Sequence, residues 1–579
     1  MVKQLLLIFL FFNIITICFS QAIVERIKQD IYTLASDSFL GRRPYTKGDT
    51  LTVNYILNEF NKNRVQLYDG TGKQQISFLH KKELKAADLV INKISYQYKR
   101  DFVPAIYSKN TNTEADAVFV GYGLYVKVKD SVLYDYYYEA NVKNKWLIVL
   151  TGKPETVNMP RSYYSENAKA TIAKRKDAKG IIFVLKDNQL PEQDFYNLTE
   201  MQVPIIYITN DVFKELCSTE NYSYEELMQK SENEFYFKPV YFTSKIKATI
   251  SIEMVKGYSN NIIGITEGSD PLLKNEYIVV GAHHDHLGEK VYNYQSNSFV
   301  MQIFNGADDN ASGISGMLEL VRIVQNQQVK PKRSIIWVAF AAEEMGLIGS
   351  KEFVKNPPVP INQIKAMINL DMIGRIDEKT LKLSVSGTGT SKIFKKLFKQ
   401  YKSKFSFNFV ENPSGEGPSD HASFYRKNIP VLFLHSGLHE DYHQPTDDTD
   451  KINFNGMAQI INFAYVLLTD LANYPKKINF SETKLKQKTK SHNEIRISLG
   501  IIPDVSTSTE GLKVEGVREG SIAEKGGLKK GDIIISINGK NVKNIYDYME
   551  RLEEFGNEKM MKIKVKRNRE IKELNVRLF

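Results

Sequence analysis

The sequence predicts an α/β fold in which a mixed, mostly parallel sheet is sandwiched by helices. Three observations lead to this prediction. Residues 250–474 alternate short apolar runs with amphipathic helical patterns, which is typical of parallel strands covered on both faces. Residues 110–247 change to closely spaced β-runs, which indicates a β-rich α/β insert domain. Residues 493–579 contain short β-runs and an Asn538-Gly539 turn, which predict a small β module at the C-terminal end.

Length and composition indicate several globular domains. A chain of 579 residues is too long for one hydrophobic core, and its 42% hydrophobic and 25% charged residues are typical of folded proteins. The formal net charge of +11 is spread over lysine-rich stretches such as 395–404 and 484–490. Because no nucleic-acid-binding motif accompanies them, we interpret these stretches as solvated surface and expect no nucleic-acid partner.

Residues 1–20 have the pattern of a signal peptide, with Lys3 before an apolar run and small residues at its end. We expect cleavage before Gln21 and an exported protein, periplasmic or secreted, without a transmembrane anchor. The residues on either side of Cys18 are bulky, which argues against the alternative of lipid attachment at that cysteine. Cleavage leaves Cys217 alone, so no internal disulfide is expected.

The pattern of apolar and polar residues divides the chain into consecutive segments. Near the N-terminus a helical pattern at Val24, Ile27, Ile31 and Leu34 precedes a strand-like run over Leu89–Tyr98. The predicted segments are the N-terminal part of the main domain over 21–109, the insert over 110–247, the main domain over 248–475, a polar linker over 476–492 and the terminal module over 493–579. The strands of the main domain are expected near 277–280, 334–340, 366–370 and 429–434.

Polar side chains with metal-binding chemistry follow these strands. His283 and Asp285 come directly after the first strand, at the carboxyl end where α/β sheets place their sites. Asp308 and Asp309 precede a predicted helix, so they could instead stabilise its N-terminus. Asp371 closes a later strand. Seven of the nine histidines lie between positions 283 and 443, which indicates one shared site.

The strand over 334–341 ends in the adjacent acids Glu343 and Glu344. Two neighbouring carboxylates repel each other in a low-dielectric setting unless cations are present, so a metal site accounts for the pair. The last strand leads to a polar loop that contains His443. Histidine and carboxylate ligands without cysteine suit zinc, with manganese or cobalt as possible substitutes.

Five ordered motifs now identify a resemblance that covers about residues 21–474. They are Gly281-Ala282-His283-His284-Asp285, Gly306-Ala307-Asp308-Asp309-Asn310-Ala311-Ser312-Gly313, Glu343-Glu344-Met345-Gly346-Leu347, Asn369-Leu370-Asp371-Met372-Ile373-Gly374 and Tyr442-His443-Gln444-Pro445. Together they resemble the co-catalytic dizinc aminopeptidase family, the MH-clan zinc exopeptidases. The resemblance implies the zinc exopeptidase fold and two zinc ions per chain. One ion would be held by His283 and Asp371 and the other by Glu344 and His443, with Asp309 bridging both.

The resemblance also implies roles for three further residues. Asp285 would orient His283, as carboxylates near metal-bound histidines usually do. Glu343 would be the general base that takes a proton from water activated by the two zinc ions. Tyr442 would steady the tetrahedral oxyanion, although it could also be a packing aromatic. The remaining histidines of the cluster are not implied as ligands: His284, His286, His421, His435 and His439.

Two accessory modules show weaker resemblances. The insert over 110–247 resembles the protease-associated (PA) domain, and we expect it to shape access to the zinc site. The C-terminal module resembles a PDZ domain, with Ser498-Leu499-Gly500-Ile501 as the carboxylate-binding loop. Such domains hold the C-terminal ends of peptides or proteins, which makes these tails possible partners.

The sequence therefore predicts an exported zinc exopeptidase that acts on peptide substrates, most simply an aminopeptidase. Three alternatives remain open: a carboxypeptidase, a glutaminyl cyclase that uses one zinc ion on the same fold, and a peptide-binding protein without catalysis. The complete set of candidate ligands and the candidate base argue against the last two, because such proteins would lack part of it.

Overall fold

The computed structural model describes residues 21–128, 131–159, 161–193, 195, 199–234, 236–292, 300–483, 499–503, 511–517, 521–542, 547–548, 551–552, 560–567 and 570–577. The predicted signal peptide, most of the predicted linker and Ser498 lie outside these residues, as do most of residues 545–555, whose sequence pattern predicts a helix. Within them, no helix has both the length and the apolar composition that crossing a membrane requires.

The chain forms two compact units. The first contains the described residues up to Phe78 and from Tyr258 onward, and the second contains Leu79–Gly257. The predicted insert over 110–247 lies inside the second unit, which begins earlier and ends later than the β-run pattern indicated. Its identity as a PA domain stays a prediction, as do the domain boundaries.

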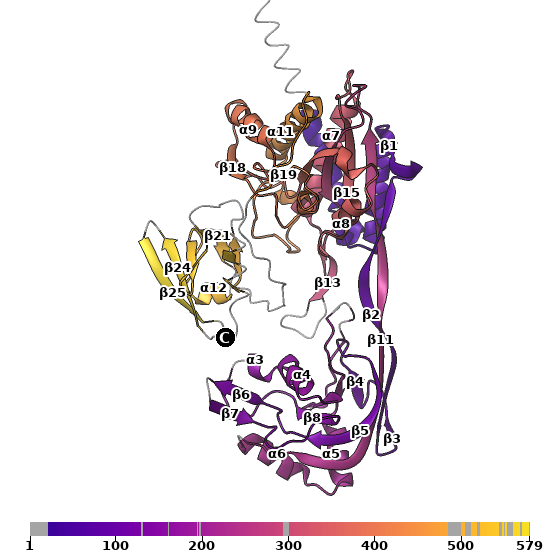
Figure 1. Cartoon of the computed structure of the whole chain (residues 1–579), viewed down its shortest axis with the longest axis vertical. Coiled ribbons are helices and arrows are strands. Elements are labelled where there is room, and N and C mark those ends of the chain that lie inside the picture. The colour runs from indigo at the N-terminus through magenta and orange to yellow at the C-terminus, as the bar shows by residue number, and fades with distance from the viewer. Residues whose placement is uncertain are drawn as a thin grey trace, which may run out of the picture. The chain divides into compact units, whose positions relative to one another are not determined.

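The main part of the first unit is built on a mixed sheet (Figure 1). Its elements are a helix over residues 21–34, η1 (Asp37–Arg42), α2 (Lys47–Lys62), β1 (Gln66–Leu67), η2 (Tyr68–Gly70), β12 (Tyr277–His283), β13 (Gly288–Tyr292), β14 (Val300–Phe304), η3 (Ala307–Ser312), α7 (Gly313–Gln325), β15 (Ser334–Phe340), α8 (Ile348–Lys355), η4 (Ile361–Gln363), β16 (Ile364–Leu370), β17 (Lys382–Ser386), α9 (Lys392–Lys404), β18 (Asn408–Asn412), α10 (His421–Tyr425), β19 (Val431–His435), η5 (Thr449–Lys451) and α11 (Phe454–Asn473). Two long strands, β2 (Lys73–Ile91) and β11 (Val240–Thr266), carry the chain between the units.

The strand order in this unit is β18-β17-β19-β16-β12-β15-β11, with β1 beside β11. Neighbours within β15-β12-β16-β19 are parallel, whereas β17 is antiparallel to β19 and β11 is antiparallel to β15. The predicted mixed, mostly parallel sheet is therefore confirmed. The strand positions also agree with the apolar runs, because strands covered on both faces are apolar throughout.

Helices cover both faces of this sheet, and alternation along each strand divides its side chains between two cores. On β12, Ile278 and Val280 belong to the core that contains side chains of α7 and α11. Val279 instead belongs to the core that contains Phe353 of α8 and Phe424 of α10. Because successive side chains of a strand point to opposite faces, this division gives a helix–sheet–helix sandwich.

In the second unit the strand order is β11-β5-β8-β9-β10-β4. Its elements are β3 (Ile94–Tyr96), β4 (Phe102–Pro104), β5 (Thr111–Phe119), β6 (Tyr125–Val128), β7 (Ser131–Asp135), β8 (Trp146–Leu150), α3 (Arg161–Tyr164), α4 (Glu166–Arg175), β9 (Gly180–Val184), β10 (Ile205–Ile208), α5 (Asn210–Thr219) and α6 (Tyr224–Asn233). Strands β5, β8, β9 and β10 are parallel, with antiparallel neighbours at both ends. This unit is a β-rich α/β domain with apolar cores on the two faces of its sheet.

The C-terminal module is an antiparallel sheet of the order β20-β21-β22-β24-β25, with β23 beside β22. Its elements are β20 (Ile501–Pro503), β21 (Leu512–Val517), α12 (Ile522–Lys525), β22 (Ile533–Ile537), β23 (Lys540–Asn541), β24 (Met560–Arg567) and β25 (Glu570–Arg577). A separate apolar core that includes Leu512, Ile534 and Ile563 holds these strands together. The expected small β module is confirmed.

Candidate metal centre

The parallel strands bring their polar ends to one edge of the sheet. His283 is the last residue of β12, Asp371 directly follows β16, and Glu343 and Glu344 follow β15 by a few residues. Because β12 is parallel to both β15 and β16, these carboxyl ends lie together. His443 comes from the loop after β19, completing the edge.

Asp309 reaches the same place from η3, the short helical segment before α7. Gly306 precedes this segment with φ +57°, and a Cβ there would lie 2.1 Å from the Asp309 carbonyl oxygen. Only glycine can occupy this position, which explains the Gly-Ala-Asp motif. The carboxylates of Asp308 and Asp309 do not cap α7: Asp308 accepts a hydrogen bond from the Gly374 amide at 2.6 Å, and Asp309 faces the histidines.

The first group of candidate ligands is His283, Asp309 and Asp371. The Nε2 atom of His283 lies 3.3 Å from Asp309 Oδ1 and 3.4 Å from Asp371 Oδ1. All three residues are buried, and their ligand atoms lie close enough together to hold one ion. The Asp371 carboxylate is oriented by Ser419, whose hydroxyl donates a hydrogen bond to Oδ2 at 2.6 Å.

The second group contains His443, Asp309 and Glu344. The Nε2 atom of His443 lies 3.2 Å from Asp309 Oδ2 and 3.1 Å from Glu344 Oε2. Asp309 therefore uses Oδ1 toward the first group and Oδ2 toward the second. The structure thus brings all five predicted ligand residues together, and it gives Asp309 the central position between two histidines.

These distances suit zinc ions. Two ligands that each lie about 2.0–2.1 Å from a tetrahedral zinc ion are about 3.3 Å apart. The buried Nε2 atom of His443 makes no hydrogen bond to any residue that the structure describes, although two carboxylates are near it. A buried ring nitrogen without a hydrogen-bond partner, placed between two carboxylates, is available as a metal ligand.

The electrostatics of the site also favour cations. Burial lowers the pKa of His443, but Asp309 and Glu344 outweigh it and raise that pKa to about 10. Burial likewise opposes protonation of His283, yet Asp371 and Glu343 hold its pKa well above the usual range. Without metal, therefore, protons on the histidines provide positive charge that zinc would supply instead.

His286 is a further residue of this site that the sequence prediction did not include among the ligands. Its Nδ1 atom lies 2.8 Å from Glu344 Oε1 and 3.8 Å from Asp309 Oδ2, so its atoms are close enough to hold an ion with these two carboxylates. Its contact with Glu344 also matches a role in orienting that carboxylate. The sequence signal available for His286 was its position in the same polar segment as His283 and Asp285.

Asp285 makes different contacts from those expected. The Nδ1 atom of His283 lies 3.1 Å from the main-chain oxygen of Asp285 and 3.8 Å from its carboxylate. The carboxylate instead accepts hydrogen bonds from the amides of Glu343 at 3.0 Å and Glu344 at 3.3 Å. The main-chain oxygen of Asp285 is thus the nearer partner of the His283 ring, and an orienting role for the Asp285 carboxylate stays a prediction.

Glu343 and Tyr442 line a cavity of about 310 Å³ together with four of the candidate ligands. Burial raises the pKa of Glu343 well above that of an ordinary carboxyl group. Burial also raises the pKa of Tyr442, with nearby Asp309 adding to the shift, so the phenol keeps its proton. The Tyr442 ring stacks on the His443 ring with centroids 3.9 Å apart, so it both packs and faces the cavity.

Arg42 holds together the backbone of two segments that carry candidate ligands. Arg42 is 1% exposed, and its guanidinium donates to five main-chain oxygens. The acceptors are those of His284 at 3.1 Å, Leu34 at 2.8 Å, Asn305 at 2.5 Å, Gly306 at 2.9 Å and Asp309 at 3.4 Å. Burial lowers the pKa of Arg42 to about 10, so it stays charged at neutral pH. The sequence gives no signal for these contacts, because the acceptors are main-chain oxygens.

The other histidines of the cluster have partners outside the ligand groups. His284 Nε2 contacts the Asn260 main-chain oxygen at 3.1 Å, and His439 Nε2 lies 3.2 Å from Asp308 Oδ2. The His421 ring stacks on Phe433 with centroids 4.5 Å apart. These contacts support the expectation that they are not ligands.

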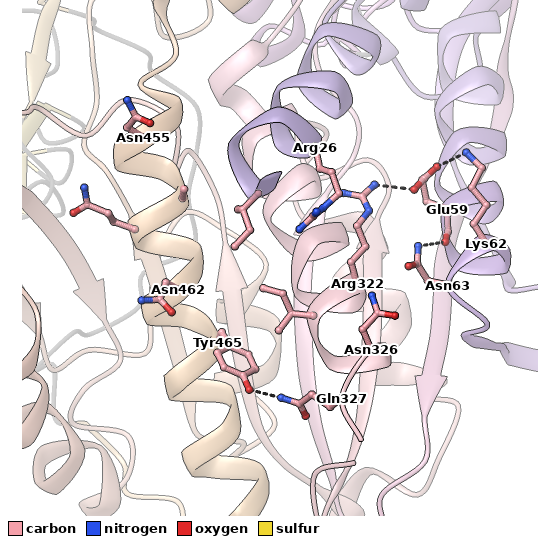
Figure 2. Close-up of a pocket in the computed structure, with 14 residues that line it drawn as sticks. Arg26, Glu59, Lys62, Asn63, Arg322, Asn326, Gln327, Asn455, Asn462 and Tyr465 are labelled. Carbon is pink, nitrogen blue, oxygen red and sulfur yellow. Dashed lines mark hydrogen bonds and ion pairs between the residues drawn. The ribbon is translucent and has the colours of Figure 1, made fainter. Parts of the chain in front are cut away.

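A larger cavity, of about 1150 Å³, lies between the helix over 21–34, α2, α7 and α11 (Figure 2). Its charged side chains already have partners: Arg322 pairs with Glu59 at 2.7 Å, and Arg26 pairs with Glu319 at 2.5 Å. None of the candidate ligands lines this cavity. We therefore place the chemistry in the smaller cavity, which contains the metal-binding groups.

Comparison with known families supports this assignment. Residues 261–484 match the model described as peptidase family M28, and residues 513–567 match that of a PDZ domain. The first range contains all five candidate ligands together with Glu343, Asp285 and Tyr442. The predictions of a metallopeptidase of the hydrolase class and of a PDZ domain are thereby confirmed.

Several relatives have similar sequences. Uncharacterized protein YfbL of Escherichia coli is 27% identical over 264 residues, which cover 40% of this chain and 78% of that protein. Aminopeptidase YwaD of Bacillus subtilis is 27% identical over 42% of this chain and 52% of its own length. Probable leucine aminopeptidase 1 of Trichophyton verrucosum is 30% identical over 37% and 58%. The chain thus spans little more than half of each of these two aminopeptidases.

Among solved structures, the zinc aminopeptidase BSAP from Bacillus subtilis superimposes with a TM-score of 0.44 at 19% identity. The superposition covers 80% of this chain and 96% of that one.

Proposed function

We propose that the chain, which matches the peptidase family M28 model over residues 261–484, is a zinc-dependent aminopeptidase that removes residues from the amino ends of peptides. The convergence of His283, Asp309, Glu344, Asp371 and His443 beside Glu343 in one cavity carries this proposal. The names of the relatives, two of which are aminopeptidases, favour the amino end over the carboxyl end.

The residues present would hold two zinc ions. His283 and Asp371 would bind one, Glu344 and His443 would bind the other, and Asp309 would contact both through its separate oxygens. Bound zinc supplies a Lewis acid for the scissile carbonyl and lowers the pKa of water. Manganese or cobalt would be substitutes with the same ligand set.

Glu343 is the general base of the proposal. It lines the cavity, and burial raises its pKa, which brings the group closer to the neutral range in which a base works best. Its carboxylate would accept a proton from water and later return it to the leaving amine. Because Asp285 binds the Glu343 amide at 3.0 Å, the base is held at a fixed place in the loop.

Tyr442 would donate its phenolic hydrogen to the oxygen that becomes negative during the reaction. The raised pKa keeps this hydrogen in place, and stacking on His443 keeps the ring beside the cavity. A preorganised donor of this kind lowers the barrier because it needs no reorientation as charge develops.

A panel of free and amino-blocked peptides tests the proposal. The purified full chain is incubated with each peptide, the products are weighed by mass spectrometry, and zinc is quantified in the same sample. Stepwise loss from free amino ends with two zinc ions per chain is the expected result. Loss of residues from carboxyl ends would establish a carboxypeptidase. Ammonia release from amino-terminal glutamine with one zinc ion per chain would establish a glutaminyl cyclase. The absence of any reaction would establish a binding protein.

The remaining parts of the proposal concern the accessory regions. Export is supported by the leader-like pattern of residues 1–20. The PDZ domain would hold C-terminal tails of substrates or partner proteins, because PDZ domains bind extended peptides along a strand edge. Loss of tail binding on deletion of residues 493–579, with peptidase activity retained, is the expected test result.

A further inference from the structure

The cavity with the metal-binding residues extends onto the edge of the sheet formed by β19, β17 and β18. Its lining there includes Ser384 and Ser386 of β17, Asn412 of β18, and Phe433 and His435 of β19. We call these five residues the floor of the cavity. The same cavity contains Glu343 and four of the candidate ligands, so a peptide whose reacting carbonyl lay at the metal centre would place the adjacent side chain on this floor.

Strand alternation separates the floor from the core. Leu383 and Val385 of β17 belong to the buried apolar core, whereas Ser384 and Ser386 between and beside them line the cavity. The same pattern holds on β19, where Leu432 and Leu434 pack in that core and Phe433 and His435 line the cavity. The serines are therefore on the cavity face by the period of the strand.

The register places these side chains beside each other. Ser384 pairs with His435 and Ser386 pairs with Phe433 in the antiparallel ladder, so the two pairs are cross-strand neighbours on one face. Asn412 pairs with Ser386 on the other side. The result is a compact floor of two hydroxyls, one carboxamide and one imidazole, with Phe433 as its apolar part.

Most polar groups of this floor can bind a ligand; the exception is the Asn412 carboxamide oxygen, which accepts a hydrogen bond from the Ser414 amide at 3.0 Å. Neither serine hydroxyl has a hydrogen-bond partner in the part of the chain that the structure describes, although Ser384 is only 7% exposed. The Nδ1 atom of His435 accepts a hydrogen bond from the Gly437 amide at 2.8 Å, so in the neutral ring the hydrogen is on Nε2. The floor thus offers two hydroxyls and an N–H group.

The charge of the lining restricts which side chain can enter. Among the described residues that line the cavity, Glu416 is the one carboxylate outside the metal centre, and it pairs with Arg426 at 2.7 Å. A charged side chain on the floor would therefore be buried without a partner of opposite charge, which is costly. An aliphatic side chain would leave the hydroxyls and the imidazole N–H without partners.

We propose that this floor is a specificity pocket for amino-terminal asparagine and glutamine, whose neutral carboxamide side chains satisfy the two serines and His435. The proposal rests on the aminopeptidase function and names its substrate class. The carboxamide oxygen accepts from His435 Nε2, and the carboxamide N–H groups donate to the Ser384 and Ser386 hydroxyls. Asparagine and leucine have similar size and shape, so the difference between them measures the polar contacts alone.

The test compares dipeptides with amino-terminal asparagine, leucine, glutamine and methionine by kcat/KM. We expect asparagine to exceed leucine, and glutamine to exceed methionine, by at least about tenfold, because a site built for hydrogen bonds rejects an analogue without them. The double variant Ser384→Ala with Ser386→Ala should lower asparagine turnover, raise leucine turnover and so reverse the order. Ser403→Ala, at an exposed serine of α9, is the matched control and should leave the order unchanged.

The remaining possible outcomes of this test also support or overturn the proposal. Hydrolysis of leucine peptides at a rate equal to or above that of asparagine peptides overturns the pocket and leaves the aminopeptidase function standing. If no peptide is cleaved, the aminopeptidase function fails, and calorimetry with asparagine and leucine hydroxamates then tests the pocket by binding. Equal affinity for the two hydroxamates overturns it. If the double variant does not fold, the wild-type ratios and the hydroxamate affinities still decide.

Discussion

Replacing Arg42 by lysine should weaken both the fold and the affinity for zinc. The guanidinium donates to five buried main-chain oxygens, and a lysine ammonium has three hydrogens to donate. At least two oxygens lose their partner, and each buried unsatisfied group costs about 1–3 kcal/mol. The free energy of unfolding should therefore fall by about 2–6 kcal/mol, although the positive charge is retained.

Zinc affinity should fall as well, because three of the five oxygens belong to Asn305, Gly306 and Asp309, around the central ligand. Loss of groups that orient metal ligands typically costs about 10–100-fold in metal affinity. Competition with a chromogenic chelator measures this loss directly, without any dependence on turnover. Denaturant unfolding followed by Trp337, in a Trp146→Phe background, measures the stability of the first unit.

Arg333→Lys is the matched control. Arg333 is also 1% exposed, and it donates to Glu276 and to main-chain oxygens near the end of α11, including that of Leu471 at 3.2 Å. Its replacement should destabilise the unit but leave zinc affinity unchanged. If Arg42→Lys binds zinc as tightly as wild type, or if both variants lose affinity equally, the argument that Arg42 positions the metal ligands is refuted.

Three further predictions follow from single groups. Glu343→Gln should lower kcat by about 10²–10⁴-fold with both zinc ions still bound, and a variant that keeps full activity would exclude Glu343 as the base. Chelation should lower the unfolding free energy reported by Trp337 and leave that reported by Trp146 unchanged, since the metal groups lie in the first unit; equal shifts would contradict this. Burial lowers the pKa of Lys169 to about 7, so the folded state binds fewer protons than the unfolded state between about pH 7 and 10.5. Stability of the second unit should rise with pH in that window by up to about 1.4 kcal/mol per pH unit, and Lys169→Met should flatten the curve measured through Trp146.

The sheet was predictable because local patterns determine it. Strands such as β12 and β15 are apolar throughout, as a strand covered on both faces must be, and a helical repeat follows each. The antiparallel position of β17 was not predictable, since its order in the sheet depends on long-range packing. The second unit extends beyond the predicted insert over 110–247, because β2 and β11 continue as strands beyond the segment whose composition changes.

The clustering of metal-binding residues was predictable because the carboxyl ends of parallel strands meet at one edge, whereas the assignment of individual ligands rested on the family resemblance. The contacts of His286 and Asp285 were harder to predict. The same sequence is compatible with a hydrogen bond to a side chain and with one to the main chain. Arg42 carried no signal at all: its partners are main-chain oxygens up to 267 positions away, which any residue type could provide. The role proposed for the serines of β17 was not predictable for a related reason. Strand alternation predicts a polar face but does not predict which residues lie opposite that face.

The distribution of buried charge explains how Arg42 can position the candidate ligands without competing with a metal ion. Burial raises the pKa of Asp285 to about 7 and that of Asp447 to about 6, so these acids resist ionisation in the metal-free site. Arg42 is a fixed cation among them, but it uses its hydrogens on main-chain oxygens and leaves the carboxylate oxygens of Asp309 to the two histidines. It can therefore position the ligands without occupying their metal-binding atoms. Had a lysine or arginine instead paired with Asp309, it would have competed with zinc for the same oxygens, and the bridging position would have been lost.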